Sequence, residues 1–274
     1  MPRRVLLAGC GQVGGELAGR LAARGAEVFA LRRDTTALPS CVTPLPVDLL
    51  SDRLSTEVEP LPAVDAMVVT LTPGIGGPGN PDGYLAALGN LATALPGVPA
   101  RTVFVSSTGV FDRPTQDGTL TEADTPVPAS PRAQTLLAGE RAAEALFGAL
   151  VVRPAGIYGP GREFMLRTAT SGTPVQYARR TNRIHQTDLV RALEVMLDAV
   201  DPPAVLHAVD QRPATLGEVV TFLADELGVK PPPPVTPEEP TGSFFDGAAL
   251  GRLVGALRYP GFVQGYRGML AQRR

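Results

Sequence analysis

Short apolar runs alternate with helical patterns along most of this 274-residue chain, and this alternation restricts the fold more than any other feature. Strands that are apolar throughout, with amphipathic helices between them, are typical of a parallel sheet covered on both faces. The predicted strands are RVLLAG (4–9), AEVFAL (26–31), 42–47, DAMVVTL (65–71), RTVFVSS (101–107), ALVVRP (149–154) and AVLHAVD (204–210). The sequence therefore predicts an α/β fold with a doubly wound parallel sheet.

The first run ends in a glycine-rich turn, GCGQVGG, in which Gly9, Gly11 and Gly14 form a G-x-G-x-x-G pattern. The turn follows a predicted strand and opens a predicted helix, which is the context that a dinucleotide-binding (Rossmann) motif requires. The first glycine allows a tight turn, the second lets the backbone approach a pyrophosphate, and the third lets helix and strand pack closely. The helix N-terminus then offers N–H groups to the phosphates. Glycines in a merely structural turn are the alternative.

The second strand ends at Arg32, Arg33 and Asp34, where a dinucleotide-binding domain recognises the adenosine ribose. Because a guanidinium pairs with a 2′-phosphate, the arginines favour NADP as the cofactor. In the alternative, NAD binds, the arginines are exposed on a turn and Asp34 serves the ribose. Asp48 either meets the adenine amino group or is a plain turn residue. Further cofactor contacts are expected from Gln12, Val13, Leu49, Thr70 and Leu71.

The regular alternation weakens after Pro154, which indicates a second, smaller part of the chain. The segment KPPPPVTPEEPTG (230–242) is neither helix nor central strand, because its prolines lack the backbone donor and fix φ. We therefore expect a dinucleotide-binding domain over 1–154 and 182–210. A small substrate-side lobe over 155–181 and 211–274 completes the predicted organisation.

Composition excludes several other classes of protein. Hydrophobic residues make up 44% of the chain and charged residues 19%, as in a packed globular core. The net charge of −2 gives no general attraction to nucleic acid or to an anionic membrane. No apolar stretch approaches the roughly 18 residues of a membrane span. We therefore expect a cytoplasmic protein with no nucleic-acid or membrane partner. With two cysteines and two distant histidines, we expect neither a disulfide framework nor a metal site.

Three further segments follow the glycine turn in a specific order: SSTGVF, RPAGIYGPGR (153–162) and RIHQTDLVRAL (183–193). With the glycine turn, they resemble the extended short-chain dehydrogenase/reductases, the NAD(P)-dependent epimerase/dehydratase family, over roughly residues 3–210. The combination of GCG, SSTGV and NRIH is most similar to an atypical branch of that family, whose members often lack the catalytic pair.

The resemblance implies a catalytic Ser, a Tyr that acts as general acid/base, and a Lys four residues after the Tyr. The Ser position matches Ser107, whereas the Tyr and Lys positions fall on Arg132 and Leu136. An arginine does not exchange its proton near pH 7, so Arg132 is left with a binding role. The only lysine, Lys230, lies in the proline-rich segment. Substitute proton donors are Tyr158, Tyr177 and His185, whose imidazole exchanges protons near neutral pH.

Two functions remain open on these residues. The first is an NADP-preferring oxidoreductase or epimerase with weak or unorthodox activity on a small, anionic substrate. Its anionic group is held by Arg183, together with Arg132, and Tyr158 is a further substrate residue. The alternative is a non-catalytic dinucleotide-binding redox sensor or regulator. Alternatively, the basic stretch around Arg183 is a solvated loop that binds no substrate.

The family resemblance also implies a homodimer through the helices at 82–95 and 132–147. Leucines at 85, 88, 91, 136, 137 and 146 could supply an apolar face for it. The same leucines could instead cover the sheet.

Overall fold

The computed structural model describes residues 2–51, 61–77, 79–80, 82–112, 118–236 and 240–273. The chain divides into two compact units. The first unit comprises Met1–Val110, Pro128–Arg153 and Val190–Leu206, and the second comprises Phe111–Val127, Pro154–Leu189 and His207–Arg274. These boundaries differ from the predicted ones mainly at 111–127 and 182–189, which lie with the second unit.

The main sheet has seven strands in the order β11-β7-β5-β4-β1-β2-β3. The pairings of β1 with β2 and β4, of β5 with β4 and β7, and of β2 with β3 are all parallel. The strands are β1 (Arg4–Ala8), β2 (Glu27–Leu31), β3 (Thr43–Leu45), β4 (Ala66–Val69), β5 (Arg101–Val105), β7 (Leu150–Pro154) and β11 (Val205–Ala208). Each lies within one of the seven apolar runs of the sequence, so the predicted α/β fold with a doubly wound sheet is confirmed.

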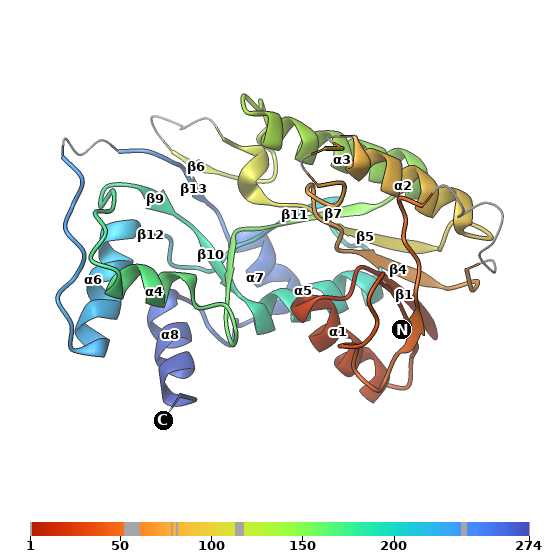
Figure 1. Ribbon diagram of the computed structural model, residues 1–274, viewed down its shortest axis with the longest axis horizontal. Helices are drawn as coiled ribbons and strands as arrows, with labels where there is room; N and C mark the ends of the chain where they lie inside the picture. The colour runs from red at the N-terminus through yellow and green to blue at the C-terminus, as the bar shows by residue number, and fades with distance from the viewer. Residues whose placement is uncertain are drawn as a thin grey trace. The chain divides into compact units, whose positions relative to one another are not determined.

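Helices cover both faces of this sheet (Figure 1). On one face, α2 (Gly83–Ala94) and α3 (Pro131–Phe147) lie side by side. On the other face lie α1 (Gln12–Ala23) and α5 (Gln186–Asp198), which are joined by ion pairs from Arg20 and Arg24 to the buried Glu194. A core of apolar side chains fills the space between the sheet and the helices α2 and α3, among them Leu6, Met67, Leu88, Leu91, Phe104 and Phe147.

The leucines expected at a dimer interface divide between the core and the surface. Leu88, Leu91 and Leu136 are buried, whereas Leu85 and Leu146 are 39% and 37% exposed. Covering the sheet therefore accounts for part of this apolar stripe, and dimerisation through α2 and α3 stays a prediction.

The start of α3 follows the local sequence closely. The Ser130 side chain accepts a hydrogen bond from the backbone of Ala133, and Pro131 occupies the first helical position. At the other end, Gly148 takes a left-handed conformation with φ of 58° and closes the helix. A short 3₁₀ helix, η1 (Thr108–Val110), follows β5 and packs against α3.

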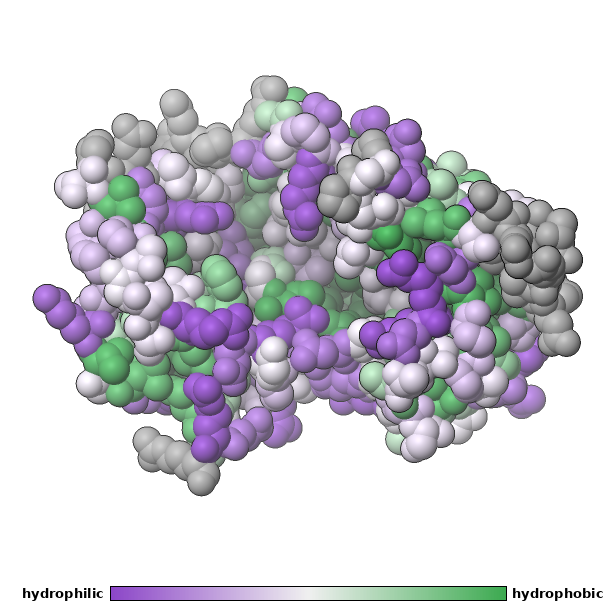
Figure 2. Space-filling model, in the orientation of Figure 1, coloured by the Kyte–Doolittle hydropathy of each residue, from purple (hydrophilic) through white to green (hydrophobic). Residues whose placement is uncertain are grey.

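The second unit contains three small sheets and four helices among its described residues. The strands are β6 (Thr119–Leu120) with β13 (Phe244–Phe245), β8 (Gly156–Tyr158) with β10 (Arg183–His185), and β9 (Arg180–Thr181) with β12 (Ala214–Thr215). The helices are α4 (Phe164–Thr170), α6 (Leu216–Leu227), α7 (Ala248–Val254) and α8 (Phe262–Ala271). Apolar side chains of α4, α6 and α8 pack into one core, and part of the apolar surface of this unit is visible in Figure 2.

Within the described ranges, no helix is both long and apolar enough to cross a membrane.

Candidate functional site

The glycine turn is held from two sides at Gly9. The Gly9 N–H donates to the Leu31 carbonyl oxygen at 3.0 Å, and the Thr70 hydroxyl donates to the Gly9 carbonyl oxygen at 2.8 Å. Gly9 has a φ of +89°, which L side chains rarely adopt, and an added Cβ would lie 2.8 Å from the Thr70 oxygen. Only glycine therefore fits this position, and Thr70, at the end of β4, contributes to the shape of the turn.

The other two glycines differ in their surroundings. A Cβ added to Gly14 would approach the Gly9 carbonyl oxygen to 3.2 Å, whereas one added to Gly11 would meet nothing within 4 Å. Gly11 is the N-cap of α1. Because glycine has no side chain, Gly11 does not cap the backbone N–H groups of the first turn, from Gln12 to Gly14. This open space next to uncapped N–H groups would suit a pyrophosphate, whose oxygens would accept hydrogen bonds from those N–H groups.

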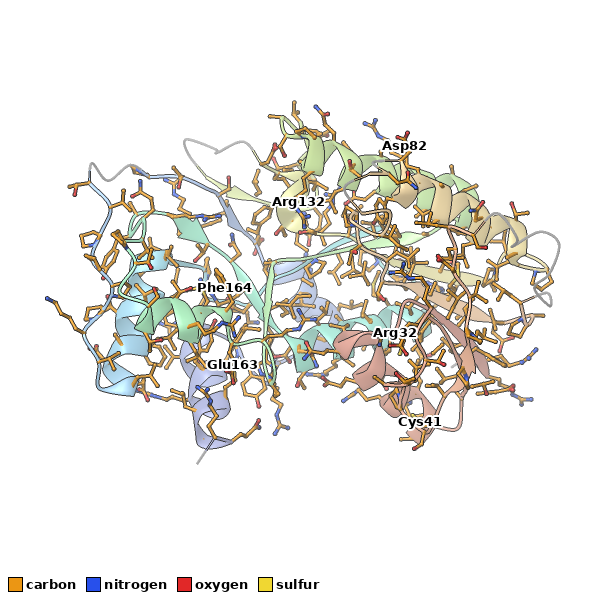
Figure 3. The ribbon with its side chains drawn as sticks, viewed as in Figure 1. Arg32, Cys41, Asp82, Arg132, Glu163 and Phe164 are labelled. Atoms are coloured by element: carbon orange, nitrogen blue, oxygen red, sulfur yellow. The ribbon has the colours of Figure 1, made fainter. Side chains whose placement is uncertain are left out.

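Arg32 lies at the end of β2, beside this turn (Figure 3). Its Nη1 donates to the Cys10 carbonyl oxygen at 3.1 Å, and its side chain is partly buried, whereas Arg33 is exposed. The Asp34 carboxylate accepts from the Thr36 N–H at 2.9 Å and from the Thr36 hydroxyl at 2.6 Å. These hydrogen bonds hold the pKa of Asp34 below its usual range. Of these three residues, Arg32 is therefore placed against the turn, and Asp34 is engaged in its own loop.

The segment after β3 forms a tight turn at Asp48. One Asp48 carboxylate oxygen accepts from the Leu50 N–H at 3.0 Å, so Asp48 has the turn role that its sequence position allowed. Leu49 is buried in the core, and Leu71 packs at the edge of the same core. The Leu49 carbonyl oxygen accepts a hydrogen bond from the Asn90 side chain of α2 at 2.7 Å. Asn90 was not predicted, because its sequence position, 41 residues away on an apolar helix, gives no signal of this contact.

The structure brings two of the expected catalytic positions together around Gly109. A Cβ added to Gly109 would lie 3.2 Å from the Ser107 oxygen and 3.5 Å from Leu136 Cδ1. The Ser107 oxygen accepts from the Gly109 N–H at 3.0 Å, and the Leu136 side chain is buried. An apolar side chain therefore fills the position where the family resemblance implies a lysine. Arg132 is exposed on the first turn of α3 (Figure 3).

The remaining predicted site residues lie in the second unit, and there Tyr158 and His185 are in contact. Both are buried, and their rings meet edge to face with centroids 5.1 Å apart. The His185 ring stacks on Tyr259 at 3.8 Å, and its Nδ1 accepts from the Thr187 N–H at 3.2 Å. Burial raises the pKa of the Tyr158 phenol, which makes it a weaker acid. These surroundings favour packing roles over proton transfer.

Arg183 is also buried rather than part of a solvated loop. Its Nη2 donates to the Thr181 hydroxyl, and its guanidinium carbon lies 5.3 Å from the centroid of the Phe262 ring. Its Nη1 and one oxygen of the buried Asp210 carboxylate have no hydrogen-bond partner among the described residues. Burial raises the pKa of Asp210 to about 7, against the opposing charge of Arg183. A substrate-binding role for Arg183 stays a prediction.

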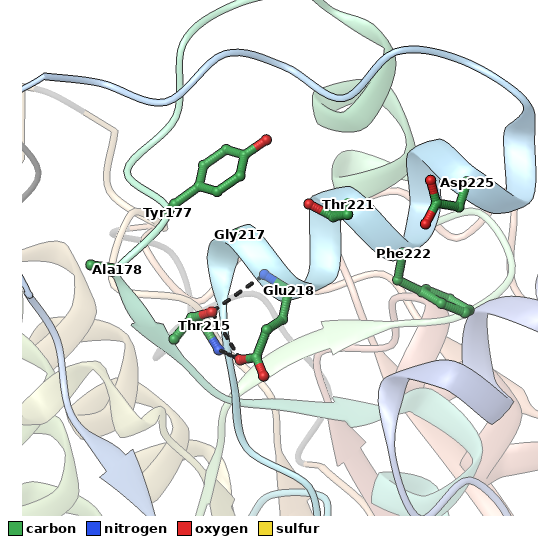
Figure 4. Close-up of a pocket in the computed structure, with 8 residues that line it drawn as sticks. All are labelled: Tyr177, Ala178, Thr215, Gly217, Glu218, Thr221, Phe222 and Asp225. Atoms are coloured by element: carbon green, nitrogen blue, oxygen red, sulfur yellow. Dashed lines mark hydrogen bonds between the residues drawn. The ribbon is translucent and has the colours of Figure 1, made fainter.

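A surface pocket of about 680 Å³ lies along α6 (Figure 4). It is lined by Tyr177, Ala178, Thr215, Gly217, Glu218, Thr221, Phe222 and Asp225. The Glu218 carboxylate accepts from the Thr215 N–H and hydroxyl, which completes a capping box at the start of α6. The Tyr177 hydroxyl donates to the Pro232 carbonyl oxygen at 2.6 Å. The pocket is therefore built from structural groups, and none of the predicted cofactor residues lines it.

Comparison with known proteins gives a sequence relative and several solved structures with the same fold. No family model matches the chain. The protein YeeZ of Escherichia coli K12 is 27% identical over 245 residues, which cover 84% of this chain and 86% of YeeZ. A candidate NAD-dependent epimerase/dehydratase from Methylobacillus flagellatus matches with a TM-score of 0.83 and 29% identity, over 99% of this chain and 98% of that one. The UDP-glucuronic acid 4-epimerase of Bacillus cereus, solved with UDP-glucuronic acid and NAD, matches in fold with a TM-score of 0.77 and 16% identity, over 98% of each chain.

The parallel sheet and the glycine turn define a protein of the Rossmann type. Its structural neighbours include an NAD-dependent epimerase/dehydratase candidate at 29% identity, so the predicted resemblance to this family of extended short-chain dehydrogenase/reductases is confirmed. The narrower resemblance to a branch that lacks Tyr and Lys stays a prediction.

Proposed function

We propose that this chain is an NADP-preferring dinucleotide-binding protein of the epimerase/dehydratase type, with weak or unorthodox oxidoreductase activity on a small anionic molecule. The observation that carries the proposal is the position of Arg32, whose guanidinium donates to the Cys10 carbonyl oxygen within the glycine turn. This position supports a role for Arg32 at the adenosine ribose, which follows the pyrophosphate in a Rossmann domain.

The residues of the first unit divide the binding task. The N–H groups at the start of α1 and the open space at Gly11 would accommodate the pyrophosphate, and Arg32 would pair with a 2′-phosphate. Asp48 would meet the adenine amino group with the carboxylate oxygen that does not bind the Leu50 N–H. A bound dinucleotide supplies hydride transfer, and Ser107 would orient the group that reacts.

Proton transfer is where this chain departs from the family pattern. The buried Leu136 neither donates a hydrogen bond to the nicotinamide ribose nor lowers the pKa of a neighbouring acid. Arg132 is exposed, and a guanidinium there would stabilise an anion without exchanging a proton. These substitutions also support the second candidate, a non-catalytic redox sensor that binds the same cofactor.

Calorimetry with NADPH and NADH tests the cofactor preference. One charge-assisted hydrogen bond to the 2′-phosphate contributes about 1.5–3 kcal/mol. NADPH should therefore bind at least about tenfold more tightly than NADH. Arg32→Ala should remove most of that difference.

The matched control for this variant is Arg141→Ala, which removes an exposed arginine of α3 and should leave the preference unchanged. Equal or tighter binding of NADH by the unmodified protein would refute the NADP preference.

A further inference from the structure

A single peptide group after β3 is held at both of its ends. The Leu49 carbonyl and the Leu50 N–H belong to one planar peptide unit. Asn90 Nδ2 donates to the carbonyl oxygen at 2.7 Å, and the Asp48 carboxylate accepts from the N–H at 3.0 Å. The orientation of this plane therefore fixes the orientation of the Asp48 carboxylate.

The residues described around this peptide group restrain it in different ways. The Leu49 side chain is 2% exposed and packs into the core, which fixes where the residue lies. Packing of a side chain does not by itself fix the rotation of the peptide group that follows it, because φ and ψ remain soft. The Ser51 N–H donates to the Asp48 carbonyl oxygen at 3.1 Å, which closes the turn on itself. The Asn90 side chain connects this turn to α2 by a hydrogen bond, beside the apolar packing of Leu49 in the core that α2 shares.

We propose that Asn90 is a positioning residue for the adenine end of the cofactor, acting through the Leu49–Leu50 peptide on the Asp48 carboxylate. The inference rests on the proposed dinucleotide-binding function. Without the Asn90 donor, the Leu49 carbonyl loses this hydrogen bond, and the peptide keeps only the one from the Leu50 N–H to Asp48 among the two described here. The Asp48 carboxylate then loses its fixed direction, and the adenine end of the site is no longer preorganised.

The test separates the two halves of the cofactor. Binding of 2′,5′-ADP, NADP and nicotinamide mononucleotide is measured by calorimetry for the unmodified protein and for Asn90→Ala. Thr93→Ala is the matched control, because Thr93 is an exposed residue on the same helix, and its hydroxyl donates to the Gly89 carbonyl oxygen within that helix. We expect Asn90→Ala to bind 2′,5′-ADP and NADP about tenfold more weakly, as for the loss of one hydrogen bond. Asn90→Ala should bind nicotinamide mononucleotide as the unmodified protein does. The thermal midpoint of Thr93→Ala should equal that of the unmodified protein.

Each other outcome has a definite meaning. Unchanged binding of 2′,5′-ADP by a folded Asn90→Ala would overturn the positioning role alone. Equal weakening of the adenine and nicotinamide ligands would also overturn it, because a general structural effect would then suffice. Asn90→Ser, whose shorter side chain cannot reach the Leu49 carbonyl, repeats the test, and failure of both variants to fold would assign Asn90 to stability. If the unmodified protein bound none of the adenine ligands, the proposed function would fail together with this inference.

Discussion

Two glycines of one turn have opposite structural constraints. At Gly9 the positive φ and the nearby Thr70 oxygen exclude a side chain, whereas at Gly11 the φ of −83° and the open space exclude nothing. Folding alone therefore explains the glycine at position 9 but does not explain the glycine at position 11. Close approach of a ligand to the backbone, as the proposed function requires, would account for Gly11.

This contrast gives a prediction for each glycine. Gly11→Val should fold with a thermal midpoint close to that of the unmodified protein and lose most of its NADP affinity, because the side chain fills the space for the pyrophosphate. Gly9→Ala should be less stable by about 1–3 kcal/mol, because alanine is strained at this φ and crowds Thr70. Thermal unfolding and calorimetry on both variants check this. Normal cofactor binding by Gly11→Val would contradict the assignment of the turn.

The buried Asp210 carboxyl should make the stability of the second unit depend on pH. Burial raises its pKa from an ordinary value near 4 to about 7, although Arg183 and Arg212 oppose the shift and Asp188 adds to it. Between these values the folded protein holds a proton that the unfolded chain releases. The stability that this bound proton gives to the folded protein is therefore fully present below about pH 4, and it is lost as the pH rises through about 7.

Asp210→Asn imitates the protonated carboxyl and should reduce the fall in thermal midpoint between pH 5 and pH 8. The exposed Asp225→Asn of α6 serves as the control for loss of one charge. An unchanged slope in Asp210→Asn would show that the carboxyl is ionised throughout this range.

At the scale of elements, α3 is joined to β7 by a buried ion pair. Arg153 Nε and Nη2 donate to the two Glu140 carboxylate oxygens at 3.0 and 2.7 Å, and both residues are 5% exposed. Such a bidentate pair keeps its charges satisfied away from water, but removal of one partner leaves an unpaired buried charge. The pair therefore determines how α3, which carries the Tyr and Lys positions, is attached to the sheet.

Arg153→Met alone should lower the free energy of unfolding by about 3–5 kcal/mol, because it leaves the Glu140 carboxylate unpaired. The double variant Glu140→Leu with Arg153→Met should be more stable than Arg153→Met, since no buried charge remains. Urea unfolding of the two variants and the unmodified protein measures this difference. Additive losses in the double variant would mean that the two charges are not coupled.

The elements could be predicted from the sequence because period and end signals are local. Buried strands are apolar runs, and Ser130, Pro131 and Gly148 mark the ends of α3 in the sequence itself. The glycine turn was likewise predicted with its roles, since strand, turn and helix follow one another directly. The contacts of Asn90 with Leu49 and of Glu140 with Arg153 were not predicted, because they depend on which elements meet in space. The burial of Arg183 was missed for the same reason, since a stretch rich in arginine gives no local signal of burial.

At the scale of the whole molecule, the structure combines the glycine turn of a Rossmann domain with a helix, α3, that has Arg132 and Leu136 at the Tyr and Lys positions of the family. The turn has open space at Gly11 and a hydrogen bond between Thr70 and Gly9, as the proposed pyrophosphate site requires. The helix α3 keeps its cap and its attachment to the sheet, while Leu136 packs beside Ser107 as part of the core. The residues that shape the glycine turn and attach α3 to the sheet are therefore different from those that would transfer a proton.

The last prediction follows from this division. Alcohols, ketones and nucleotide sugars, tested with NADP(H), should show turnover far below the ordinary range of about 1–1,000 per second. No acid/base stands at position 132, and the phenol of Tyr158 is a weaker acid than usual because it is buried. Residual activity should fall in Ser107→Ala, because the Ser107 hydroxyl is the group left to orient a carbonyl, and should not depend on Arg132. Cofactor binding by each variant, measured alongside, distinguishes a lost reaction from a lost ligand. Robust turnover by the unmodified protein that vanished in Arg132→Ala, with cofactor still bound, would show that an exposed guanidinium on α3 takes part in the reaction.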